Sequence, residues 1–126
     1  MPVPRITKEE LKQRLDTAEP AERPTVIDVR LKYPYEHSGV KLPGALRVSP
    51  KELDTSAIPR ARDVVAYDSD PDEIVSSRVA AQLIRQGFQA RALKGGIAEW
   101  MAASYPVEAK EGSRPAPPQT ATVKGS

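Results

Sequence analysis

The 126-residue chain contains no cysteine. Without a thiol it cannot form a disulfide, a thiolate metal site, an iron–sulfur cluster or a cysteine nucleophile. The single histidine, His37, leaves no histidine-rich metal centre, and we expect it to lie in a surface loop without a catalytic role. The sequence therefore predicts neither a metal site nor a cofactor.

Long apolar runs are also missing. No run approaches the ~20 residues that a membrane-spanning helix needs. The first ten residues carry charge where a secretory signal has an apolar core. We therefore expect a cytoplasmic protein with no membrane insertion, and Met1 favours a free-standing chain.

Aromatic residues are few, at 5% of the chain, and the net charge is only +2. Residues 109–126 hold three basic side chains and one acidic side chain, so residues 1–108 are neutral overall. A neutral body has no large field to attract a polyanion, and few rings remain for bases to stack on. Nucleic-acid binding is not expected.

The length fits one domain, since compact domains most often have ~100–150 residues. The composition changes near residue 109 to proline, alanine, threonine, serine and glycine, with Val123 as the only large apolar residue beyond it. Such a segment cannot form a core. We therefore predict a domain over residues 1–108 and a disordered tail over residues 109–126.

Hydrophobic patterning predicts alternating strands and helices. Short β-branched or apolar runs indicate strands at residues 25–29, 45–48, 63–67 and 88–93. Thr7 and Glu10 have capping-box spacing and predict a helix to about residue 16. A second helix should begin near Glu73 and end before Gly87, and a last helix should carry Trp100 in the core. The alternation favours an α/β fold with a largely parallel sheet.

Two further segments have local signals of their own. Ser49 followed by Pro50 is typical of a helix start, with serine as the cap and proline at the first position. Residues 33–39 are interpreted as a turn, because Pro34 and Gly39 interrupt regular structure.

Several motifs, in order along the chain, resemble the signatures of the rhodanese-like family. They are Asp-Val-Arg at residues 28–30, Leu-Pro-Gly-Ala at 42–45, Val-Val-Ala-Tyr at 64–67, Gly-Phe at 87–88, Leu-Lys-Gly-Gly at 93–96, Trp100 and Pro-Val at 106–107. The resemblance covers about residues 6–108. It implies a central, largely parallel five-stranded sheet flanked by helices on both faces.

The resemblance also implies where the family's chemistry lies. In active members, the residue after the strand at 64–67 is a cysteine that carries sulfur as a persulfide, within a ring of backbone N–H groups. Here the equivalent residues of the active-site loop are Asp68, Ser69, Asp70, Pro71, Asp72 and Glu73. Aspartate occupies both cysteine positions of a family variant, whereas Pro71, Glu73, Ser76 and Arg78 match it. By the same resemblance, that variant also occurs as a soluble appendage of membrane proteins. In that case the tail of this chain, residues 109–126, would be a linker.

A carboxylate can accept hydrogen bonds from loop amides, but it contains no sulfur and cannot become a persulfide. The sequence therefore predicts a domain that is silent in sulfur transfer and serves as a binding or regulatory module for an unidentified protein partner. The alternative is a sulfurtransferase-family protein with residual activity, or with metal-dependent hydrolysis at the aspartates.

The hydrolytic alternative rests on Asp68 and Asp70, whose spacing resembles the motif of haloacid-dehalogenase-type phosphatases. The run of acids also resembles the start of an EF-hand loop, although Glu73 stands where glycine is needed and Val79 where a bidentate glutamate is needed. We favour a simpler interpretation, in which the acids stabilise the N-terminus of the following helix, with Asp72 as the cap.

Three charged residues are candidates for the edge of the family's cleft. Asp28 and Arg30 follow a strand, and we favour a structural ion pair for them over a role in binding. Arg78, two turns into the predicted helix, could neutralise the loop aspartates or face solvent.

Overall fold

The computed structural model describes residues 3–17, 19, 23–69 and 73–110. Its centre is a five-stranded sheet in the order β1-β6-β5-β2-β4, and every neighbouring pair is parallel. The strands are β1 (Arg5–Ile6), β2 (Thr25–Asp28), β4 (Leu46–Arg47), β5 (Asp63–Tyr67) and β6 (Gln89–Leu93). The predicted five-stranded parallel sheet is confirmed.

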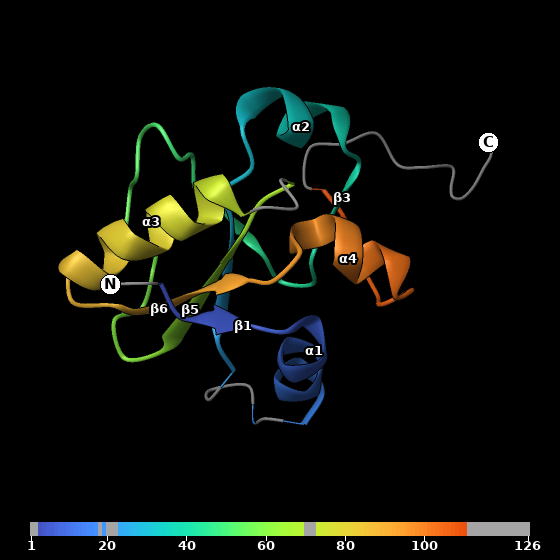
Figure 1. The fold of residues 1–126 in the computed structure, drawn as a ribbon, viewed down its shortest axis with the longest axis horizontal. Coiled ribbons are helices and arrows are strands. Elements are labelled where there is room, and N and C mark those ends of the chain that lie inside the picture. Colours follow the sequence, from blue (N-terminus) through green and yellow to red (C-terminus); the bar gives the residue numbers. More distant parts are fainter. Residues whose placement is uncertain (1–2, 18, 20–22, 70–72, 111–126) are drawn as a thin grey trace.

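Helices cover both faces of this sheet, as expected. Helix α3 (Ile74–Arg85) lies above the sheet in Figure 1, and α1 (Lys8–Thr17) lies below it. Helix α4 (Gly96–Ala102) packs on the α1 side, because Trp100 and Leu11 belong to the same buried cluster.

Alternation along the strands explains the two cores. Ile27 and Val64 face the cluster under α3, whereas their neighbours Val26 and Val65 face the cluster under α1 and α4. Successive strand residues point to opposite faces, so a run of apolar residues serves both layers. Trp100 is fully buried, which confirms its place in the core.

The helix ends follow the sequence signals. The Glu10 amide donates to Thr7 Oγ1 at 3.1 Å, and the Thr7 amide donates to Glu10 Oε1 at 3.2 Å, which is the predicted capping box. At the C-terminal end of α3, Gly87 has φ 95° and its amide donates to the Ile84 carbonyl. The Phe88 amide donates to the Leu83 carbonyl. This is a Schellman motif, and it needs glycine's freedom at positive φ.

Two local predictions are wrong. Residues 33–39 were expected to form a turn, but α2 (Lys32–His37) occupies most of this segment, and Pro34 is tolerated because it lies in the first helical turn. His37, expected in a loop, is the last residue of α2; it is exposed, and its Nδ1 lies 3.0 Å from the Tyr33 carbonyl.

No helix begins at Ser49. Side chains satisfy the amides locally instead: Ser49 Oγ accepts from the Lys51 amide at 3.3 Å, and Asp54 Oδ1 accepts from the Ser56 amide at 3.0 Å. Such bonds compete with helix formation. The segment therefore forms bends and turns.

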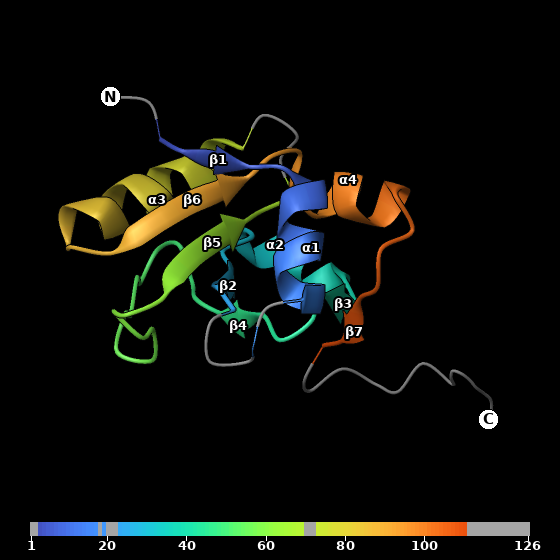
Figure 2. The ribbon, with the colours of Figure 1, turned by 90° about the horizontal axis from the view of Figure 1, so that it is seen from below.

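A second, two-stranded sheet is antiparallel. Figure 2 shows β3 (Val40–Lys41) beside β7 (Glu108–Ala109), in register through Val40 with Ala109. The predicted tail thus begins with an ordered residue, whereas residues 111–126 lie outside the described part of the chain. Within the described ranges, no helix is long and apolar enough to cross a membrane.

Candidate functional site

Asp68 lies at the carboxyl end of β5 and is buried, with 1% of its surface exposed. Its Oδ2 accepts a hydrogen bond of 2.6 Å from the amide of Ser76, the third residue of α3. The first amides of a helix lack intrahelical partners and carry a partial positive charge. The carboxylate therefore occupies an anion position at the N-terminus of α3.

The backbone of Asp68 is held by the start of α4. Its carbonyl accepts from the Ile97 amide at 3.0 Å. Gly96 has φ 62°, and a Cβ at this position would lie 2.4 Å from the same carbonyl oxygen. The Gly95-Gly96 pair thus permits a contact that no side chain allows.

Glu73 supports the loop from its other end. It precedes α3 with φ 60° and is 3% exposed. Arg5 Nε and Nη2 each donate to its carboxylate at 2.7 Å, and the Gly95 amide donates at 3.1 Å. The hydrogen bonds from Arg5 hold the pKa of Glu73 below its usual range. Glu73 therefore ties β1, α3 and the Gly95 turn together.

Asp28 and Arg30 form the expected ion pair, at 2.6 Å and almost fully buried. The Tyr67 hydroxyl also donates to Asp28 Oδ2, at 2.9 Å. Burial and the Asp28 charge raise the pKa of Tyr67. The pair lies at the carboxyl end of β2, beside the end of β5 that leads to Asp68.

The other predicted site residues are placed differently. Ser69 follows Asp68 and is partly buried. Arg78 is exposed on α3 and makes no ion pair with a described residue, so a neutralising role towards Asp70 stays a prediction. Asp70, Pro71 and Asp72 lie outside the described residues. The predicted cap at Asp72 therefore stays a prediction, and the cap that the structure describes is Asp68.

Among the described residues, no group of three or more histidine, cysteine or acidic side chains could hold a metal ion. Sequence reasoning missed two contributors, Arg5 and the Tyr67 hydroxyl. Arg5 lies 68 residues from its partner Glu73, and no local pattern predicts such a pair.

Exposed apolar side chains surround the carboxyl end of the sheet, where Asp68 lies. Leu31, Tyr33 and Ile74 are 44%, 69% and 60% exposed. The first two line a groove of about 520 Å³ with Pro34, Arg47 and other residues that follow β2 and β4. Large exposed apolar groups near one groove are typical of interaction surfaces.

Comparison with known proteins supports the rhodanese-like fold. The family model of the rhodanese-like domain matches residues 7–103. The rhodanese-like domain of an Anabaena sp. protein is 30% identical, with a TM-score of 0.70 over 88% of this chain and 83% of that one. A Lactobacillus plantarum protein is 23% identical, with a TM-score of 0.71 over 83% and 87%.

A rhodanese-related protein from Thermoplasma volcanium is 16% identical, with a TM-score of 0.67 over 85% of this chain and 99% of that one. At this identity the likeness concerns the fold alone. No match was found among curated proteins.

Proposed function

Because the chain belongs to the rhodanese-like domain family and contains no cysteine, we propose that it is a member silent in sulfur transfer that serves as a protein-binding or regulatory module. The observation that carries the proposal is the position of Asp68. Its carboxylate accepts the Ser76 amide where an active member would hold sulfur. A carboxylate can fill this anion position, but it cannot form a persulfide.

The binding role is supported by the carboxyl end of the sheet. In open α/β folds, ligands bind at the carboxyl ends of the strands. Here this end carries the exposed side chains of Leu31, Tyr33 and Ile74, and the first two line the same groove. A protein surface with complementary apolar groups is the partner that these side chains suit.

The alternative of Asp-based hydrolysis is not favoured, because Asp68 is buried and bonded to a helix amide. A nucleophilic carboxylate has to reach its substrate. Magnesium-dependent phosphatase turnover that is lost in Asp68→Asn would support this alternative over the proposal.

The first test measures sulfur transfer. The purified protein is incubated with thiosulfate and cyanide, and thiocyanate is measured against a cysteine-containing rhodanese-like domain as a positive control. We expect no thiocyanate above the buffer blank. Turnover by the pure protein would overturn the proposed silence.

The second test concerns the partner. Immobilised wild-type protein is compared with Tyr33→Ser and with the control Ile84→Ser, whose side chain is exposed (41%) near the far end of α3. We expect one protein to be retained by the wild type and the control and lost with Tyr33→Ser, with all three folded by circular dichroism. Equal retention by all three would show that this surface is not the binding site.

The predicted cytoplasmic location is part of the proposal, and detection in fractionated cells checks it.

A further inference from the structure

A second cavity, of about 90 Å³, lies beside the edge strand β4. Its walls include Asp28, the Tyr35 ring and three cations, Lys41, Arg47 and Lys110. The cations come from three different strands or their ends, β3, β4 and the residue after β7. A space of this size holds several waters or one small ion, since one water needs roughly 10–15 Å³.

Among the described residues, Asp28 is the only carboxylate in the cavity wall, and it is already occupied. Asp28 accepts from the Arg30 amide, from Arg30 Nε and Nη2, and from the Tyr67 hydroxyl, all between 2.6 and 3.1 Å. These bonds use the approximately four lone-pair sites of a carboxylate. Arg47 Nη1 forms a longer ion pair with the same carboxylate, at 3.7 Å from Asp28 Oδ1. Arg30 makes the closest contacts to the Asp28 charge, so that charge is already balanced within the protein.

The three cations instead donate to neutral backbone carbonyls. Lys41 Nζ donates to the Ala45 carbonyl at 2.9 Å, and Lys110 Nζ donates to that of Tyr35. Arg47 Nη1 donates to the Arg30 carbonyl at 2.6 Å. An ammonium has three donors and a guanidinium has five, so each cation keeps donors for a further acceptor.

Two other carboxylates, those of Glu108 and Glu36, belong to segments near the cavity. Glu108 is opposite Lys41 in the β3–β7 pair, but its Oε1 accepts from the Gly44 amide at 3.0 Å. Glu36 is exposed on α2. Within the described part of the chain, neither forms an ion pair with Lys41 or Lys110. Burial and the charges of Arg30 and Arg47 lower the pKa of Lys110, and they outweigh the opposing charges of Asp28 and Glu36.

The Tyr35 ring holds two of the cations in place. Arg47 Cζ and Lys110 Nζ each lie 4.0 Å from its centroid. Cation–π contact with one ring fixes both charges before any ligand arrives, which lowers the entropy cost of binding.

We propose that this cavity binds a phosphate group through Lys41, Arg47 and Lys110. Asp28 is shared between Arg30 and Arg47, so the cations around the cavity outnumber the carboxylate that its described wall contains. A phosphate dianion supplies further negative charge and acceptors, and arginine binds phosphate with geometric specificity. The phosphate is either free inorganic phosphate or a phosphorylated side chain of a partner protein. This inference is independent of the role of Asp68.

The first experiment uses inorganic phosphate as the probe. The unfolding temperature of the full chain is measured with increasing phosphate, against chloride at equal ionic strength. We expect phosphate to raise the unfolding temperature of the wild type. In Lys41→Met and in Lys110→Met the apparent affinity should fall about tenfold or more, because a charge-assisted hydrogen bond is lost.

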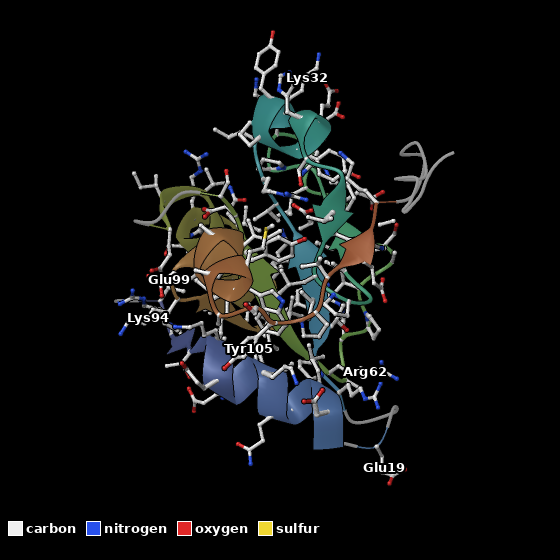
Figure 3. The ribbon with its side chains drawn as sticks, turned by 90° about the vertical axis from the view of Figure 1, so that its right-hand side faces the viewer. Glu19, Lys32, Arg62, Lys94, Glu99 and Tyr105 are labelled. Atoms are coloured by element: carbon white, nitrogen blue, oxygen red, sulfur yellow. The ribbon has the colours of Figure 1, made fainter. Side chains whose placement is uncertain are left out.

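The matched control is Lys94→Met, since Lys94 is exposed and does not line the cavity. Figure 3 shows it beside Glu99 of α4, away from Lys32 of α2. It should keep the phosphate response of the wild type. A loss as large in Lys94→Met as in Lys110→Met would show non-specific attraction and overturn the proposal.

The second experiment distinguishes the two sources. A short peptide containing one phosphoserine and its unphosphorylated twin are titrated into the wild type by calorimetry. Binding of the phosphopeptide alone, weakened in Lys110→Met, assigns the site to a phosphorylated partner, whereas a response to inorganic phosphate only assigns it to the free ion. The absence of both responses in the wild type overturns the proposal without reference to any variant.

Discussion

Asp68 is an acid fixed where the fold offers hydrogen-bond donors. Its carboxyl group is buried and accepts the Ser76 amide at the N-terminus of α3, where the helix dipole favours a negative group. The side chain therefore acts as an internal anion. An external anion could enter the same position only by displacing it.

Replacement of Asp68 tests this interpretation at the scale of one residue. In Asp68→Ala the buried Ser76 amide loses its acceptor, so the free energy of unfolding should fall by about 1–3 kcal/mol. Urea denaturation measures this. Asp54→Ala is the control, because Asp54 accepts an amide bond in an exposed turn where water can replace it. A loss as small as in the control would mean that Asp68 does not cap α3.

At the scale of elements, Glu73 connects segments that are far apart in the sequence. Its bonds to Arg5 and to the Gly95 amide join β1 and the start of α4 to the start of α3. Since the folded-state pKa of Glu73 is lowered, its contribution is present above the unfolded pKa of about 4.3 and is lost as the pH falls through the folded value.

Glu73→Gln should therefore remove part of the acid sensitivity. At neutral pH we expect a loss of about 1 kcal/mol, because the half-exposed Arg5 is screened by solvent. Below pH 4 the variant and the wild type should converge in stability. Urea denaturation across pH measures both effects. Glu52→Gln, at an exposed site, should follow the wild type at every pH; a constant gap between Glu73→Gln and the wild type would contradict the linkage.

The elements also show what the sequence could predict. The bounds of β5, the capping box of α1 and the glycine end of α3 are set by residues within a few positions of one another, so local patterns identify them. Strands β1, β3 and β7 have two residues each and exist only through distant pairing. No local pattern predicts strands of this kind.

The candidate site divides in the same way. The position of Asp68 could be predicted because it directly follows a strand within a recognised motif. The Arg5–Glu73 pair and the Tyr67–Asp28 bond could not, since their partners are 68 and 39 residues apart. The helix predicted at Ser49 is wrong for a different, local reason. The side chains of Ser49 and Asp54 accept nearby backbone amides and form turns in place of the helix.

At the scale of the whole molecule, one sheet separates two cores. Leu83 is fully buried under α3, whereas Trp100, the only tryptophan, lies in the core on the opposite face. Both cores include residues of β2 and β5, so we expect them to unfold together.

Leu83→Ala tests this coupling. It should lower the free energy of unfolding by about 2–5 kcal/mol. Trp100 fluorescence and far-ultraviolet circular dichroism should report the same shifted transition, although Trp100 does not belong to the cluster around Leu83. Ile84→Ala, at a 41% exposed neighbouring position, should change stability by about 0.5 kcal/mol or less. An unchanged Trp100 transition in Leu83→Ala would show that the two faces unfold separately.

The strand order also has a consequence for the time course of synthesis. Strand β1 precedes the other strands of the sheet in the sequence, yet Arg5 pairs with Ala92 and Ile6 with Leu93, near the end of the sheet-forming sequence. The central strand β5 likewise gains its second neighbour only when β6 has left the ribosome. The amino-terminal strand therefore waits, unpaired, while most of the chain is translated, and long-range parallel pairing of this kind forms slowly. Closure of the sheet therefore comes late in its assembly, because its first strand in sequence pairs only with its last.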